Sequence, residues 1–115
     1  MKIVIVNDKI SESELREIAK EFYIDMIKGA IDVEKEIVAF GGEWHMDANN
    51  KLIENGSKQN NIWGFNIYFN KLKEERLEYF SLINIRPGQG NRGMEIEDEN
   101  LRKTIKEIID KIIVG

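Results

Sequence analysis

Residues 62–69 read Ile-Trp-Gly-Phe-Asn-Ile-Tyr-Phe, and this stretch decides what kind of fold the chain can adopt. Large apolar side chains alternate with smaller or polar ones, which is the pattern of a half-buried β-strand. A sheet with one apolar and one partly polar face is therefore expected. The apolar face of this predicted strand carries Trp63, Phe65, Ile67 and Phe69, and its other face carries Gly64, Asn66 and Tyr68.

Three strands are predicted upstream of this one. Residues 3–6 form a continuous β-branched run, which is typical of a buried strand. Residues 36–47 alternate again, with Gly41-Gly42 marking a bend or bulge. A short strand over residues 51–54 is expected to follow, and Asn55-Gly56 has the composition of a type I′ hairpin turn.

The last strand is predicted over residues 79–86, and Pro87 ends it because proline has no backbone N–H to donate. Ser11 and Glu14 have capping-box spacing, so a helix is expected to begin there and to end at Gly29. Its apolar stripe recurs at three- and four-residue steps.

Asp98 is the predicted N-cap of a second amphipathic helix, whose apolar stripe extends through Ile112. The predicted order is β-α-β-β-β-β-α. This order indicates a single α+β domain over residues 1–115, with a mainly antiparallel sheet of four to five strands and both helices packed on one face.

Composition narrows the function classes. The chain has 115 residues, no cysteine, and 17 basic against 21 acidic residues, a net charge of −4. The absence of cysteine excludes disulfides and cysteine-ligated metals. The acidic balance argues against nucleic acid as a partner, and no cofactor is expected. No apolar run is long enough to span a membrane, which favours a soluble, cytoplasmic protein.

Glu43, His45 and Asp47 are spaced two residues apart, so a regular strand would present them on one face. A carboxylate beside the only histidine could orient it as a general base. A hydrolase-like enzyme is one hypothesis, with Arg86 stabilising negative charge. A solvated strand face is the competing interpretation, and no metal site is predicted because zinc needs three or four ligands.

Residues 86–93, Arg-Pro-Gly-Gln-Gly-Asn-Arg-Gly, satisfy G-x-G-x-x-G but lack the following helix and βαβ unit of a dinucleotide site. Two guanidinium groups among glycines instead suit an anion. The alternative is a loop whose arginines pair with the acidic residues 95–99. The leading hypothesis is therefore binding of a small anionic ligand or partner group. The candidate ligand-binding residues are Arg86, Gly88, Gln89, Gly90, Asn91 and Arg92, joined by Asn66 and Asn84.

Strand geometry could bring these regions together. If the Trp63 side packs beneath the helices, Asn66 points the same way as Glu43 and His45, and Asn84 and Arg86 could join them in one polar cluster. A homodimer or adaptor is the third hypothesis. Its interface would be the apolar part of the open sheet face, formed by Ile37, Ala39, Phe80 and Leu82.

Three segments carry a family resemblance: residues 42–47 (Gly-Glu-Trp-His-Met-Asp), 55–68, which begin Asn-Gly-Ser-Lys-Gln, and 83–92 (Ile-Asn-Ile-Arg-Pro-Gly-Gln-Gly-Asn-Arg). With them the chain resembles a small prokaryotic family of uncharacterised proteins, and the resemblance spans nearly the whole chain. It implies a single-domain soluble protein of unknown function and assigns no catalytic residue.

Overall fold

The centre of the molecule is an antiparallel pair of seven-residue strands, β5 (Ile62–Tyr68) and β3 (Met26–Asp32). A computed structural model describes all 115 residues and pairs these strands along their full length, with Ala30 opposite Gly64. The strand predicted over 62–69 is confirmed. Trp63, Phe65 and Ile67 face one hydrophobic core, as the alternation predicts.

The other strands extend this pair into a five-stranded sheet in the order β1-β4-β3-β5-β6, with every neighbouring pair antiparallel. The three added strands are β1 (Ile3–Val6), β4 (Ile37–Gly41) and β6 (Leu77–Glu78). A separate parallel pair joins β2 (Ile10–Ser11) to β7 (Ile113–Val114) near the C-terminus. The α+β class and the mainly antiparallel sheet are confirmed.

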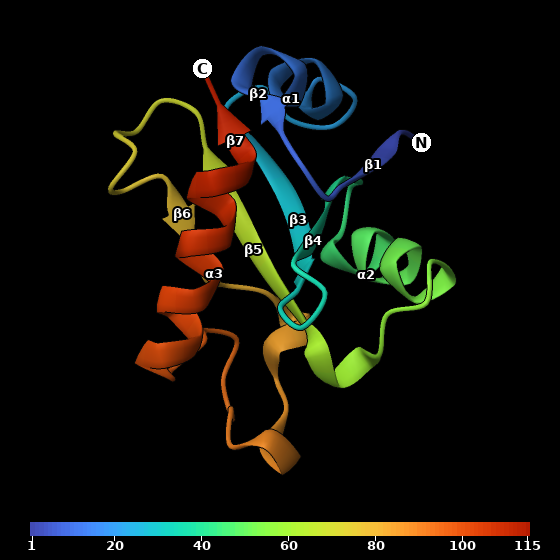
Figure 1. The fold of residues 1–115 in the computed structure, drawn as a ribbon, viewed down its shortest axis with the longest axis vertical. Coiled ribbons are helices and arrows are strands. Elements are labelled where there is room, and N and C mark those ends of the chain that lie inside the picture. The colour runs from blue at the N-terminus through green and yellow to red at the C-terminus, as the bar shows by residue number, and fades with distance from the viewer.

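Helices cover both faces of the sheet. The first face packs against α1 (Glu12–Ala19) and α3 (Glu99–Ile112) around a large aliphatic and aromatic core, as predicted for the two amphipathic helices. The second face carries α2 (His45–Glu54), a helix that the sequence pattern does not predict. In Figure 1, α3 runs beside β5, and α2 lies on the other side of β3 and β4.

Both predicted N-caps form. Ser11 Oγ accepts a hydrogen bond from the Glu14 backbone N–H at 3.1 Å. Asp98 Oδ1 accepts from the N–H groups of Asn100 and Leu101 at 2.8 and 3.1 Å. These side chains satisfy N–H groups that the first turn of a helix leaves unpaired.

The helix predicted to reach Gly29 is wrong in its second half, because α1 ends at Ala19 and β3 begins at Met26. Strand pairing on both sides of β3 satisfies its backbone groups and outweighs the weak helical spacing. Gly29 does not end a helix. A Cβ atom there would lie 2.4 Å from Phe65 Cζ, so this glycine makes room for a core aromatic ring.

The strand predicted over residues 36–47 stops at Gly41. Gly41 and Gly42 have φ angles of +119° and +94°, which turn the chain out of the sheet. Asp47 Oδ2 then accepts from the N–H groups of Glu43 and Trp44 at 3.1 and 3.0 Å and caps the start of α2. The strand over 51–54 and the hairpin at Asn55-Gly56 are therefore wrong, because these residues form and end this helix.

The last strand predicted over residues 79–86 is also wrong, because β6 is only two residues long and precedes it. This segment instead crosses over β5 and forms a 3-10 turn at Leu82–Asn84. The fully buried Asn84 holds it down: its Oδ1 accepts from Gly64 N at 2.8 Å, and its Nδ2 donates to Gly64 O at 3.0 Å. The actual element order therefore departs from β-α-β-β-β-β-α.

Gly64→Ala tests this close approach. A Cβ at residue 64 would lie 2.6 Å from Ser81 Cβ and 2.7 Å from Ser81 Oγ, so the segment must shift. We expect the free energy of unfolding to fall by about 1–3 kcal/mol, measured by chemical denaturation. Gly88→Ala is the matched control, because its Cβ would meet nothing within 4 Å. Equal effects of the two substitutions would contradict this description of the packing.

Candidate ligand-binding site

The candidate site is the part of the second sheet face that α2 leaves uncovered. Small residues at Ala30, Ala39 and Ala48 let α2 approach one end of this face closely. Toward the other end, the β3–β5–β6 register places Lys28, Asn66 and Glu78 side by side in one row. Because side chains at positions i and i+2 share a face, this row continues the same surface.

Met26 and Tyr68 form the next row of this floor. One wall is the N-terminus of α2, with Trp44, His45 and Met46, and the opposite wall is residues 80–83 with Met94. Together they enclose a cavity of about 690 Å³, within the range of small-molecule sites. We call this cavity the His45 pocket.

The rim of the His45 pocket is apolar and accessible. Trp44 is 61% exposed and Leu82 is 70% exposed, and the side chains of Met46 and Phe80 are also exposed. Large apolar side chains gathered around a cavity are typical of binding sites rather than of ordinary protein surface.

His45 is held by the floor of the pocket through one ring nitrogen. Its Nε2 lies 2.7 Å from Asn66 Oδ1 and 3.1 Å from the carbonyl oxygen of Phe65. A carbonyl oxygen only accepts, so Nε2 carries the proton and donates. Nδ1 makes no hydrogen bond and is not among the buried unpartnered atoms, so its lone pair stays accessible.

The orientation of Asn66 is fixed by its other partners. Its Nδ2 donates to Glu78 Oε1 at 2.8 Å and to the Phe80 carbonyl oxygen at 3.2 Å. Since both partners are acceptors, the amide nitrogen must face them and Oδ1 must face His45. The hydrogen bonds that link His45, Asn66 and Glu78 thus determine which of their atoms donate and which accept.

Burial lowers the pKa of His45 from its ordinary value, and the positive charge of Lys28 acts in the same direction. The hydrogen bonds to Asn66 and Phe65 and the charge of Glu78 oppose this shift without overcoming it. The imidazole is therefore neutral at neutral pH, and Nδ1 offers a hydrogen-bond acceptor to the pocket.

The two charged residues of the floor differ in how they are satisfied. Glu78 Oε1 accepts hydrogen bonds from Asn66 and from the Tyr68 hydroxyl, the latter at 2.9 Å. Burial, followed by this hydrogen bond, raises the pKa of Tyr68 and keeps the hydroxyl protonated. Lys28 Nζ instead lies 5.4 and 5.3 Å from the ring centroids of Tyr23 and Trp44 and forms no salt bridge or hydrogen bond.

The structure brings together only part of the predicted polar cluster. His45 and Asn66 meet in the pocket, whereas Glu43 and Asp47 do not share a strand face with His45, because His45 begins a helix. The carboxylate of Asp47 caps that helix. No group of three or more histidine and acidic side chains is arranged to hold a metal ion.

Arg86 lies outside the His45 pocket and holds the fold together. Its Nε and Nη1 donate to the carbonyl oxygens of Ile83 and Gln59 at 3.1 and 2.9 Å, and Nη2 donates to that of Ile62. Burial lowers the pKa of Arg86 from its ordinary value, and its guanidinium carbon lies 4.4 Å from the Trp63 ring centroid. Most of its donors are therefore already engaged.

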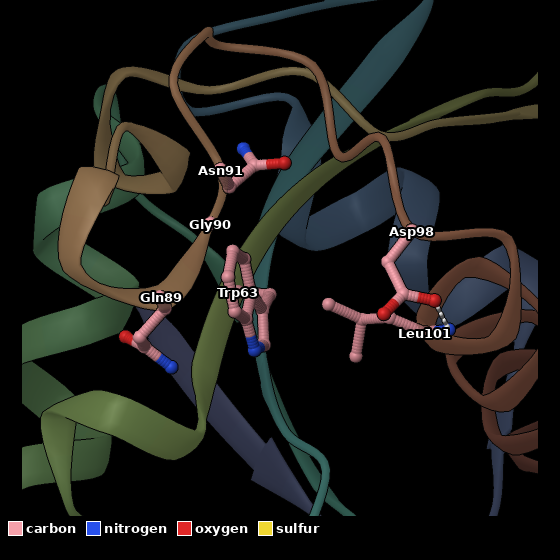
Figure 2. Close-up of a pocket in the computed structure, with 6 residues that line it drawn as sticks. All are labelled: Trp63, Gln89, Gly90, Asn91, Asp98 and Leu101. Carbon is pink, nitrogen blue, oxygen red and sulfur yellow. Dashed lines mark hydrogen bonds between the residues drawn. The ribbon is translucent and has the colours of Figure 1, made fainter.

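A second, smaller hollow of about 480 Å³ lies beside the loop 86–93 (Figure 2). Figure 2 shows Trp63 between the loop residues Gln89–Asn91 and the start of α3 at Asp98. Asn91 Nδ2 donates to three carbonyl oxygens, and its Oδ1 accepts from Glu97 N. Gln89 bonds to Asn60 and Arg86. These polar side chains serve the loop itself.

Among the remaining loop residues, only Arg92 has a side chain that is free to bind a ligand. Gly88, Gly90 and Gly93 have open space where a Cβ would lie, and Arg92 is exposed without an ion pair or hydrogen bond. Neither Arg86 nor Arg92 forms the salt bridge to residues 95–99 that was the alternative: Glu95 pairs with Arg102 at 3.4 Å, and Asp98 caps α3. The His45 pocket is therefore the better candidate site.

The open face proposed for a homodimer is smaller than expected. Ala39 is fully buried and Ile37 partly buried, because α2 packs on them. Phe80 and Leu82 stay exposed and belong to the rim of the His45 pocket. The exposed apolar residues on this side of the sheet thus form the rim of a cavity and not a continuous apolar surface.

Sequence reasoning missed Lys28 and Glu78 as site residues. Lys28 lies in the strand Met26–Asp32, but the helical spacing of the residues before it predicted a helix through this stretch. Glu78 belongs to a charged stretch that reads as a connecting loop, and nothing local shows that two of its residues pair with β5.

The fold and the pocket together define an α+β protein with an antiparallel sheet, helices on both faces and an amphiphilic cavity beside its only histidine. The chain belongs to the family described as Protein of unknown function (DUF5674), whose model matches residues 4–112. No curated protein matches the chain, and no solved structure matches it. None of its helices combines the length and apolar character needed to cross a membrane.

Arg86→Met tests the structural role of this arginine. Removing its guanidinium takes one donor from each of three carbonyl oxygens, so we expect the free energy of unfolding to fall by about 2–3 kcal/mol. Arg92→Met is the matched control, because it removes the same charge from an exposed side chain, and it should change stability by less than about 0.5 kcal/mol. Chemical denaturation measures both. An Arg86→Met substitution that leaves the free energy of unfolding unchanged would contradict the structural role of Arg86.

Proposed function

We propose that this protein binds a small organic anion with an aromatic or otherwise apolar body in the His45 pocket. The observation that carries the proposal is Lys28, an unpaired ammonium group on the floor of a largely apolar cavity. The proposal keeps the anionic ligand expected from the sequence and moves it away from the loop 86–93.

The charge of the floor supports an anion. Glu78 is stabilised by two hydrogen bonds, whereas Lys28 has only the faces of Tyr23 and Trp44 as neighbours of its charge. A carboxylate or sulfonate beside Lys28 would form an ion pair in a partly water-excluded site, where such pairs are stronger than in bulk water.

The walls support an apolar body for the ligand. Trp44, Met46, Phe80 and Leu82 present aromatic, thioether and aliphatic surface around the opening. A planar or branched hydrocarbon group that covers these side chains removes apolar area from water, which favours binding by about 25 cal/mol for each Å² buried.

Ligand binding is better supported than the hydrolase hypothesis. Asn66 and Glu78 hold His45, in place of the predicted Glu43 and Asp47, and this leaves Nδ1 free to act as a base. The pocket contains no free serine, threonine or cysteine nucleophile, however, because Ser81 is 1% exposed and its Oγ accepts from Ile83 N at 3.2 Å. Nothing in this arrangement therefore favours a covalent reaction over binding.

Two dyes of similar shape test the proposal. The anion 8-anilinonaphthalene-1-sulfonate and the neutral N-phenyl-1-naphthylamine share their aromatic body, and their fluorescence reports binding to apolar sites. We expect Lys28→Met to lower the affinity for the anionic dye by about 10-fold, the effect of losing one charged contact. The neutral dye should bind the variant almost unchanged, because methionine retains most of the apolar stem.

Lys103→Met is the control, because Lys103 is an exposed residue of α3, on the other face of the sheet. It removes the same charge and should leave both affinities unchanged. Equal weakening of the two dyes by Lys28→Met, or an equal effect of Lys103→Met on the anion, would overturn the proposal.

A further inference from the structure

We infer that the natural ligand of the His45 pocket carries a hydrogen-bond donor, a hydroxyl or N–H group set apart from its anionic group, and that His45 Nδ1 accepts that hydrogen bond. The inference rests on the proposed function and specifies the ligand class further. It assigns separate partners to the two polar ends of one molecule: Lys28 for the anion and His45 for the donor.

Nδ1 of His45 cannot act as a donor in the pocket without ligand. The Phe65 carbonyl oxygen requires a proton on Nε2, and Asn66 Oδ1 at 2.7 Å reinforces that requirement. A neutral imidazole has one N–H, so Nδ1 presents a lone pair. Because Glu78 and Phe80 fix the amide of Asn66, rotation of that amide cannot exchange the roles.

The lone pair of His45 Nδ1 has no hydrogen-bond partner within the protein. The side chains with donor groups that line the pocket are Tyr23, Lys28, Trp44, Asn66, Tyr68 and Ser81, and none of these groups donates to Nδ1. The Tyr23 hydroxyl donates to the Glu43 carbonyl oxygen at 2.6 Å, and the Tyr68 hydroxyl donates to Glu78. A ligand that buries Nδ1 without donating to it would leave an acceptor unsatisfied, which is unfavourable.

Lys28 and His45 reach the pocket from different elements, Lys28 from β3 and His45 from the start of α2. Lys28 belongs to β3 and lies against Tyr23 and Trp44, whereas the His45 ring points its Nε2 down to β5. The cavity of about 690 Å³ has room for a molecule of bicyclic size, and both residues line it. A ligand whose donor is adjacent to its own carboxylate would bond internally and could not use both contacts.

A set of naphthoates tests the inference: 2-naphthoate, 6-hydroxy-2-naphthoate and 6-methoxy-2-naphthoate, together with hydroxyl isomers that are not adjacent to the carboxylate. The methoxy group matches the hydroxyl in position but cannot donate. We expect at least one hydroxynaphthoate to bind roughly 3- to 10-fold tighter than its methoxy partner, the range of one net hydrogen bond. Isothermal titration calorimetry or ligand fluorescence measures the affinities.

His45→Phe should abolish the preference for the hydroxyl while 2-naphthoate still binds in a Lys28-dependent manner, which shows that the pocket is folded. A hydroxyl preference that persists in His45→Phe would overturn the inference. So would an absent preference for every isomer in the wild-type protein. Failure of 2-naphthoate itself to bind would instead reject the proposed function, so the two outcomes are distinguishable.

A measurement on the unmodified protein covers the case in which His45→Phe does not fold. Protonation of His45 places a proton on Nδ1 and turns the acceptor into a donor, so the hydroxyl preference should disappear as the pH falls through the pKa of His45. The groups that face this ring are Lys28 on β3, Tyr68 on β5 and Glu78 on β6, with Tyr23 before β3. A preference unchanged by protonation of His45 would contradict the inference.

Discussion

The side-chain amide of Asn66 is the interaction on which the site depends. It lies 5% exposed in β5, donates to Glu78 and Phe80 from one end, and accepts from His45 at the other. One amide therefore ties β6, the segment after it and the start of α2 to the same strand. Because buried polar groups are costly when unpaired, each partner constrains the others. The tautomer of His45 follows from this network.

The division of one sheet face creates the pocket. Alanines under α2 allow that helix to lie close to the sheet, and the larger residues further along β3 and β5 remain uncovered. The segment held by Asn84 closes the opposite side. Polar groups that satisfy one another form the floor, apolar side chains form the rim, and Lys28 is the floor charge without a counter-ion. The geometry thus separates residues that build the fold from those that line the pocket.

Sequence patterns predicted the parts of the fold that local periodicity determines. The alternation in residues 62–69, the β-branched run at the N-terminus and the caps at Ser11 and Asp98 identified two strands and two helix starts correctly. They failed where tertiary pairing overrides local spacing. β3 shows helical spacing with the residues before it, yet it pairs with strands on both sides, and only the assembled sheet makes that arrangement favourable.

The site was predictable only in part, for a related reason. The alternation placed Asn66 on the polar face of its strand, and His45 was prominent as the only histidine. Their contact depends on Gly41-Gly42 turning the chain into a helix, which the strand pattern around them concealed. Arg86 had the composition of a ligand-binding residue, but its orientation toward three carbonyl oxygens is a tertiary property. The types of these side chains suggested which interactions they can form, but only their positions in the fold determine whether they face the pocket or bond to the backbone.

The most direct measurement is the ¹⁵N NMR spectrum of the His45 imidazole at neutral pH, which is unambiguous because the chain has one histidine. The hydrogen bonds to Asn66 and Phe65 predict a protonated Nε2 and an unprotonated Nδ1, and burial of the ring predicts a pKa below the ordinary value of 6.5. The contribution of neutral His45 to the free energy of unfolding should accordingly be fully present above pH 6.5, and it should decline as the pH falls from 6.5 toward the lowered pKa of the folded protein. A proton on Nδ1, or a pKa at or above 6.5, would contradict the assignment of the pocket.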